Sequence, residues 1–133
     1  MDAATGQIRG TVRTGLHPRF LTAGAGSIWI RDAGDGTVSQ VDATKRSLSR
    51  TIHLGVQTRG GDIKYGDGVV WITLLKTPLS AIDARSGKLL CQWTGAGGDS
   101  MGVGHGSVWI SNAREQTLTR FDVHGALGHC KAG

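Results

Sequence analysis

The chain has 133 residues, with 22 glycines, two prolines and a formal net charge of +5. This length allows one domain with a hydrophobic core, and the glycine content is typical of β-structure with many tight turns rather than of a disordered chain. The longest apolar stretches are a few residues long and the basic residues are dispersed, so we expect neither a membrane span nor a nucleic-acid-binding surface.

Short alternations of apolar and polar residues, bounded by glycine-rich turns, predict strands along the whole chain. The first four are expected at 19–23, 27–32, 37–42 and 49–54, with Asp35 and Gly36 in a hairpin turn. The next four are expected at 62–65, 69–74, 79–83 and 88–93, and the last four at 100–103, 107–112, 117–122 and 127–131. No segment shows the apolar periodicity of a helix.

One sequence pattern recurs about every 40 residues. In each unit a Gly-x-Gly turn leads into a strand that contains Trp29, Trp71 or Trp109. A repeat of this length with four strands per unit predicts an all-β fold, a fragment of a β-propeller with three four-stranded antiparallel blades. Because the tryptophans recur at one position, we expect them to pack between neighbouring sheets rather than to bind a ligand.

The third strand of each unit ends with an apolar residue and an aspartate. These aspartates are expected to accept backbone N–H groups in the next turn and are not interpreted as catalytic. Asp2 belongs to the same series as Asp42, Asp83 and Asp122, because residues 1–12 match residues 82–93 position for position. Residues 1–13 are therefore predicted to be the orphan outer strand of a preceding blade, and Met1 an internal codon of a longer reading frame.

The whole chain is interpreted as a single partial propeller domain. Residues 14–55, 56–95 and 96–133 are its three blades. Propellers close with roughly four to eight blades, so the two end blades have open faces. Those faces are covered either by further blades of a longer chain or by self-association, and we favour further chain.

These units resemble the bacterial YVTN/YncE-type and streptogramin-B-lyase-type propeller repeats, which are related to the NHL repeats. The resemblance rests on the Gly-x-Gly-x-x-Trp-Ile pattern, the apolar-Asp pair and the outer strand that ends in Gly, and residues 37–42 and 50–55 are especially similar to the YVTN unit. Such propellers include binding modules and enzymes, so the resemblance implies the fold more than the activity. It also favours a periplasmic or secreted location.

A binding surface is expected at the mouth of the central channel. There the loops that lead into each blade meet the loops between the second and third strands, and exposed loops often carry function. The candidate binding residues on these loops are His17, Arg19, Arg31, Asp32, Arg59, Asp62, Asp99, Asn112 and Arg114.

Other motifs lead to no catalytic residue and no metal site. Residues 98–102 match Gly-x-Ser-x-Gly, but Ser100 precedes a strand and not the helix that a nucleophile elbow needs. Residues 32–36 resemble a calcium loop, yet a hairpin turn explains them. Cys91 and Cys130 have no metal spacing and would lie on outer strands of adjacent blades. Packed sheets are about 10 Å apart and a disulfide needs Cα atoms within about 7 Å, so we expect no bond between them.

Two functions follow from these observations, and a gene remnant without function is a third interpretation. The first is a non-catalytic segment that binds a small molecule or a protein at the channel mouth, with no evident cofactor. The alternative is part of a streptogramin-B-lyase-like enzyme, which the resemblance implies would use Mg²⁺, a His-x-His pair and a Glu. Its nearest match here is His17 and Arg19 with Asp32, or Asp99 with Asn112, so the catalytic blade would be missing.

Overall fold

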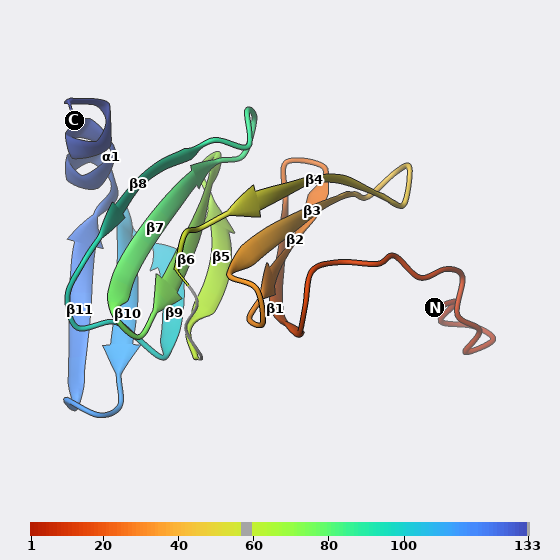
Figure 1. Ribbon diagram of the computed structural model, residues 1–133, viewed down its shortest axis with the longest axis horizontal. Coiled ribbons are helices and arrows are strands. Elements are labelled where there is room, and N and C mark those ends of the chain that lie inside the picture. The colour runs from red at the N-terminus through yellow and green to blue at the C-terminus, as the bar shows by residue number, and fades with distance from the viewer. Residues whose placement is uncertain (57–59, 133) are drawn as a thin grey trace.

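The computed structural model describes residues 1–56 and 60–132. The first blade consists of β1 (Pro18–Gly24), β2 (Ser27–Asp32), β3 (Thr37–Asp42) and β4 (Ser47–His53), and the second of β5 (Asp62–Gly66), β6 (Val69–Leu74), β7 (Thr77–Asp83) and β8 (Leu89–Trp93). The third contains β9 (Ser100–Gly104), β10 (Ser107–Asn112) and β11 (Thr117–Asp122), after which the chain forms the helix α1 (Val123–Ala132). Figure 1 shows the three sheets in a row.

Each blade is an antiparallel meander. The strand order is β1-β2-β3-β4 in the first sheet, β5-β6-β7-β8 in the second and β9-β10-β11 in the third. The turns between the first two strands contain two successive residues with left-handed backbone, such as Ala25 (φ 52°) and Gly26 (φ 69°). This is the conformation of a tight hairpin turn whose twist matches that of the strands, and it explains the second glycine of the repeated Gly-x-Gly.

The core lies between the blades. One cluster joins the first two blades around Trp29, and a second joins the second blade to the third and to α1 around Trp71. Both tryptophans are fully buried, which confirms the predicted packing role. Trp109 is only half-buried, because its side of the third blade is not covered by another blade of the described chain.

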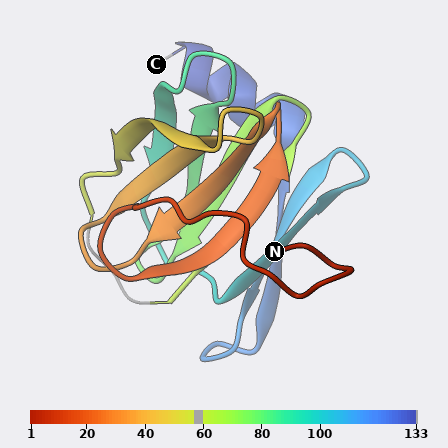
Figure 2. The same cartoon turned by 90° about the vertical axis from the view of Figure 1, so that its right-hand side faces the viewer.

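Two details of the predicted strands are wrong. Residues 127–131 lie in α1 and not in an outer strand, and residues 1–13 form no strand. Figure 2 shows this N-terminal segment crossing the side of the first blade that faces away from the second. A strand needs a neighbour to pair its N–H and C=O groups, and no other described strand lies beside this segment to pair with it.

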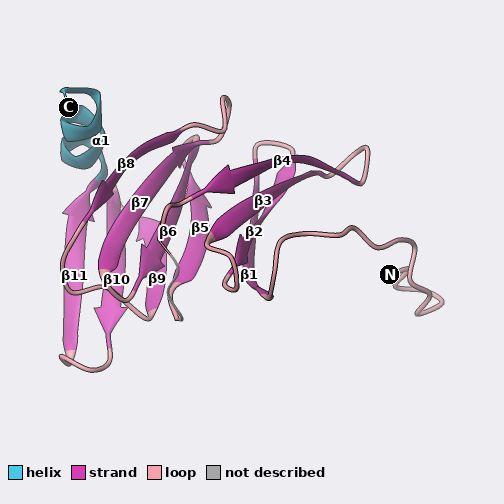
Figure 3. Cartoon of the chain, viewed as in Figure 1, coloured by secondary structure: helices cyan, strands magenta, loops and turns pink. Residues whose placement is uncertain are grey.

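One turn position differs in conformation between the third blade and the segments that form a turn after their aspartate. Four residues after each aspartate of the repeated series, Gly6, Arg46 and Gly87 have positive φ angles, which turn the chain back into a hairpin. The third blade has Ala126 there, and its backbone is helical. Without a left-handed residue at this point, the turn that starts at Asp122 continues as α1, the helix visible in Figure 3.

The expectation that Cys91 and Cys130 remain unbonded is also wrong. Their sulfurs form a disulfide, and their Cα atoms are 5.4 Å apart. The expectation assumed two packed strands at sheet spacing, whereas α1 carries Cys130 to the outer strand β8. His129 also contacts Trp93 on this strand, with ring centroids 6.3 Å apart.

No helix within residues 1–56 and 60–132 is long and apolar enough to cross a membrane.

Candidate functional site

The repeated aspartates bind the turns that follow them, as predicted. Oδ1 of Asp42 accepts N–H groups from Thr44 (2.9 Å) and Lys45 (2.7 Å), and Oδ1 of Asp83 accepts the N–H of Arg85 (2.9 Å). These backbone donors hold the pKa of both carboxyls below the ordinary value. The side chains are therefore charged, structural acceptors.

At the channel mouth, the buried Asp32 closes the loop between β2 and β3. Its Oδ2 accepts hydrogen bonds from Ser39 Oγ (2.6 Å) and Thr37 Oγ1 (3.1 Å). A Cβ atom at Gly15 would lie 2.7 Å from the same Oδ2, so only glycine allows the chain to pass here. Asp32 ties the segment before β1 to the loop after β2 rather than facing solvent.

Asp62, a second candidate, links the second and third blades. Its Oδ2 accepts the N–H of Met101 (3.1 Å) and the hydroxyl of Ser100 (3.2 Å), and its Oδ1 is 3.4 Å from Nζ of Lys64. Both oxygens are therefore engaged at the start of β5 and β9.

Asp99 and Asn112 hold the loop between β10 and β11 in the same manner. Asp99 Oδ2 accepts the N–H of Ala113 (2.7 Å), and Asn112 donates to the carbonyl of Gly97 (2.7 Å) and accepts from the N–H of Glu115 (3.1 Å). These contacts account for the polar side chains at this end of the third blade without a ligand.

The basic candidates differ in exposure. His17, with a φ of 52°, Arg19 and Arg114 are exposed, whereas Arg31 is buried. Burial, together with the nearby charge of Arg19, lowers the pKa of the Arg31 guanidinium. Arg59 lies outside the described residues.

The lyase-type ligands do not come together at this mouth. In the described part of the chain, no group of three or more His, Cys, Asp and Glu side chains is placed to hold a metal ion. Asp32, the nearest counterpart of the lyase Glu, is fully buried. Its Oδ2 is used by Ser39 and Thr37, and its Oδ1 has no partner among the described residues. The residues described here do not fit a Mg²⁺ site.

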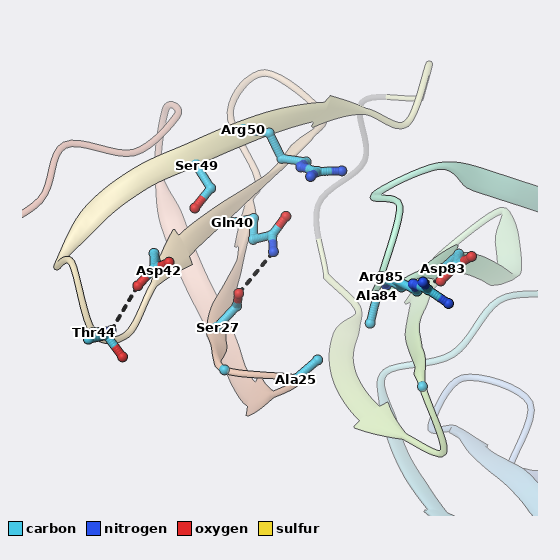
Figure 4. A pocket seen from close by; sticks show the side chains of 12 residues that line it. Ala25, Ser27, Gln40, Asp42, Thr44, Ser49, Arg50, Asp83, Ala84 and Arg85 are labelled. Atoms are coloured by element: carbon cyan, nitrogen blue, oxygen red, sulfur yellow. Dashed lines mark hydrogen bonds between the residues drawn. The ribbon is translucent and has the colours of Figure 1, made fainter.

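An open groove of about 730 Å³ lies at the opposite edge, between the first and second blades. Figure 4 shows that it is bordered by the turn at Ala25, the turn after Asp42, strand β4 and the turn after Asp83. Its polar lining includes Ser27, Gln40, Ser49, Arg50 and Arg85. Asp42 and Asp83 also line it, and their carboxylates accept the N–H groups of their own turns.

The groove offers both donors and an acceptor to a ligand. Gln40 is 8 % exposed, and its amide nitrogen donates to Ser27 Oγ (2.9 Å). Its Oε1 is buried and has no hydrogen-bond partner among the described residues. Arg50 reaches across to the carbonyl of Ser86 in the second blade, and Arg85 borders the groove beside it. A buried acceptor without a donor costs free energy that a ligand N–H would recover.

We call Ser27, Gln40, Arg50 and Arg85 the groove residues. None of them was predicted from the sequence, because the binding residues were expected at the channel mouth. A signal was present in the repeat: Ser27, Gln40 and Arg50 are polar, whereas the equivalent residues of the second blade are apolar or a cysteine. Those equivalents are Val69, Ala81 and Cys91.

No protein-family model and no curated protein matches the sequence. Among solved structures, the chain is similar to hydrazine synthase of Kuenenia stuttgartiensis (15 % identity over 90 % of this chain and 37 % of that chain, TM-score 0.70). It is also similar to BamB from Moraxella catarrhalis (16 % identity, 88 % and 38 %, TM-score 0.60) and to the Neurospora crassa Pan2 WD40 domain (14 % identity, 81 % and 37 %, TM-score 0.59). The chain spans less than two fifths of each of these.

These similarities and the row of meander sheets define the class: the chain is a segment of a β-propeller, which confirms the predicted fold. At such low identity the similarity establishes the fold alone. What the segment binds has to be argued from its own residues.

Proposed function

We propose that this chain is a non-catalytic binding segment of a β-propeller and that its groove binds a carboxylate-bearing peptide of a protein partner. The proposal rests on one observation. At the edge of the blade interface, Val69, Ala81 and Cys91 of the second blade are apolar or a cysteine. The corresponding residues of the first blade, Ser27, Gln40 and Arg50, are polar and border an open groove.

The donors and the acceptor of the groove fit a peptide with an acidic side chain. An arginine guanidinium presents parallel N–H groups that match a carboxylate, and Arg85 is placed to supply them. Oε1 of Gln40 is buried in the free chain, and a rotation of the side chain amide would present it to a peptide N–H. The net charge of +5 favours the approach of an acidic partner over a basic one.

A titration with a hexaglutamate peptide tests the site. In a two-dimensional ¹H–¹⁵N NMR spectrum, we expect concentration-dependent shifts of the amides around Ser27, Gln40 and Arg85 and a smaller response at the channel mouth. Arg85→Gln should weaken binding by about tenfold, the scale of one lost charge-assisted contact. Arg114→Gln, which removes an exposed arginine at the opposite edge, should leave the affinity within about twofold.

The same titration distinguishes the two edges of the propeller segment. Shifts confined to Arg19 and Arg114 would place binding at the channel mouth and contradict the groove. Equal shifts with hexalysine would show that the response does not depend on a carboxylate.

A YVTN/YncE-type propeller in the periplasm or outside the cell is the setting we propose for this segment. The repeat pattern supports the type, and the disulfide between Cys91 and Cys130 supports the location, since disulfides persist in oxidising compartments. No observation in the described residues favours the lyase alternative.

A further inference from the structure

The third blade presents an unpaired strand edge. In the described chain β11 pairs with β10 alone, and no strand lies on its other side. In the other two blades this place is occupied by β4 and β8. Residues 117–120 of β11 are all exposed. Such an edge carries free N–H and C=O groups that can pair with another strand.

The residues that follow β11 do not cover this edge. The chain enters α1 at Val123, and the disulfide between Cys130 and Cys91 fixes the helix to β8 of the second blade. Figure 1 shows α1 beyond one end of β11 rather than alongside it. A fourth strand for this blade must therefore come from another segment.

The N-terminal segment has the sequence and the turn of a fourth strand. Asp2 Oδ1 accepts the N–H groups of Ala4 (2.9 Å) and Thr5 (3.2 Å), as Asp42 does for the turn before β4. Gly6 has a φ of 70°, like Gly87 before β8. Residues 8–12 then continue without pairing to any described strand, and a cavity of about 490 Å³ separates this segment from the first blade.

The third blade also has an apolar face without a neighbour. Leu118 stands at the position of Val38 and Leu79, which are fully buried between blades, yet Leu118 is 66 % exposed. Trp109, beside it, is the half-buried member of the tryptophan series. The repeat thus marks this face as the surface on which a following blade would pack.

The first blade has the complementary face. Leu21 occupies the repeat position of Ile63 and Met101. Those two residues are buried against the preceding blade, whereas Leu21 is 62 % exposed. Ile28 on the neighbouring strand corresponds to Val70 in the same way. The two faces are therefore the two halves of the interface that this chain already forms twice within itself.

We propose that two copies of the chain associate head to tail. Residues 8–12 of each copy become the fourth strand beside β11 of the other, and the Leu21 face of one copy packs on the Trp109 and Leu118 face of its partner. Two copies supply six blades, within the roughly four to eight that close a propeller, whereas three copies would exceed that number.

The repeat also sets the register of the new pair. Val38 lies opposite Ile52 and Gln40 opposite Arg50 in the first blade. The same register places Val12 opposite Leu118 and Gly10 opposite Arg120. Within one copy this pairing is out of reach, because the N-terminal segment and β11 lie at opposite ends of the row of blades (Figure 1).

Light scattering coupled to size-exclusion chromatography tests the association. The 133-residue chain should elute with twice the mass of one chain. Leu118→Lys should weaken the dimer at least tenfold, because it places a charge in the apolar interface. Leu75→Lys is the matched control, since Leu75 is also exposed in the single chain but lies on neither face. This variant should keep the dimer.

A cross-linking experiment tests the register. A chain carrying Val12→Cys and Leu118→Cys should run at twice its mass on a non-reducing denaturing gel, because directly opposed residues bring their Cβ atoms within about 5.5 Å. Ile8→Cys combined with Leu118→Cys is out of register and should cross-link far less.

Two results would overturn the proposal. A wild-type chain that stays monomeric at about 100 µM would mean that both faces await further blades of a longer polypeptide, since a closed ring should associate more tightly than this. A dimer that tolerates Leu118→Lys as well as Leu75→Lys would use a different surface.

Discussion

At the scale of single residues, the aspartate that recurs in each blade precedes two different structures. Asp42 and Asp83 each bind the N–H groups of a tight turn that leads into a fourth strand. Asp122 accepts the N–H of Gly125 (2.7 Å) in the same way, but there the bond caps the first turn of α1. A side-chain acceptor placed before three free N–H groups serves a turn and a helix start equally well. The two outcomes differ in the residue four positions later, which is left-handed in Arg46 and Gly87 and helical in Ala126.

Asp32 allows a direct test of whether a channel-mouth candidate is structural. Asp32→Ala should lower the free energy of unfolding by about 1–3 kcal/mol, because the buried hydroxyl of Ser39 would lose its acceptor. Thr37 would keep Asp35 Oδ1 as an acceptor (2.7 Å). Chemical denaturation measures this difference. Glu115→Ala, which removes a carboxyl from an exposed loop, is the control. Should Asp32→Ala leave stability unchanged, the buried hydrogen bonds do not hold the loop as we describe.

At the scale of elements, the C-terminal end of the chain combines a helix and a disulfide in place of a strand. Val123 of α1 is buried in the cluster between the second and third blades, with Ala126 and Leu127 packed against it. The helix therefore adds apolar contacts to the cluster between the second and third blades. It does not pair with the edge of β11, which remains open.

The disulfide should contribute measurably to stability. Cys130→Ser is expected to lower the free energy of unfolding by about 2–4 kcal/mol, because the bond closes a long loop between residues 39 positions apart and so restricts the unfolded chain. Cys91→Ser should have the same effect, and the double variant should add little to either. A double variant twice as destabilised as each single variant would show that the two thiols stabilise the fold independently.

At the scale of the whole molecule, the blades form an open row in which each packs only on its neighbours. The middle blade has both faces buried, and the end blades each keep one face open. Stability in such arrays grows with the number of covered faces. Head-to-tail association would give every blade two neighbours and every sheet four strands.

Stability should depend on pH through the turn aspartates. The pKa values of Asp2, Asp42 and Asp83 are lowered, by Arg9 and backbone N–H groups for Asp2 and chiefly by backbone N–H groups for the others. A carboxyl with a lowered folded-state pKa stabilises the fold above its unfolded value of about 3.8 and loses this contribution as the pH falls through the folded value. The denaturation midpoint should therefore decline below about pH 4. Replacing Asp42 and Asp83 with Asn should flatten this decline, and an unchanged profile would contradict the assignment.

The sequence by itself determined the blades. Trp29, Trp71, the Gly-x-Gly turns and the aspartate series recur because every blade makes the same contacts with its neighbours, and a repeated contact leaves a repeated residue. Features that occur once in the chain produce no repeated sequence pattern. The path of α1, the disulfide it carries to β8 and the open groove at Gln40 depend on which segments meet in space, and only the tertiary structure decided them. The channel-mouth carboxylates show the same limit. The sequence pattern of a polar loop residue is the same whether its side chain contacts a ligand or, like that of Asp32, two buried hydroxyls.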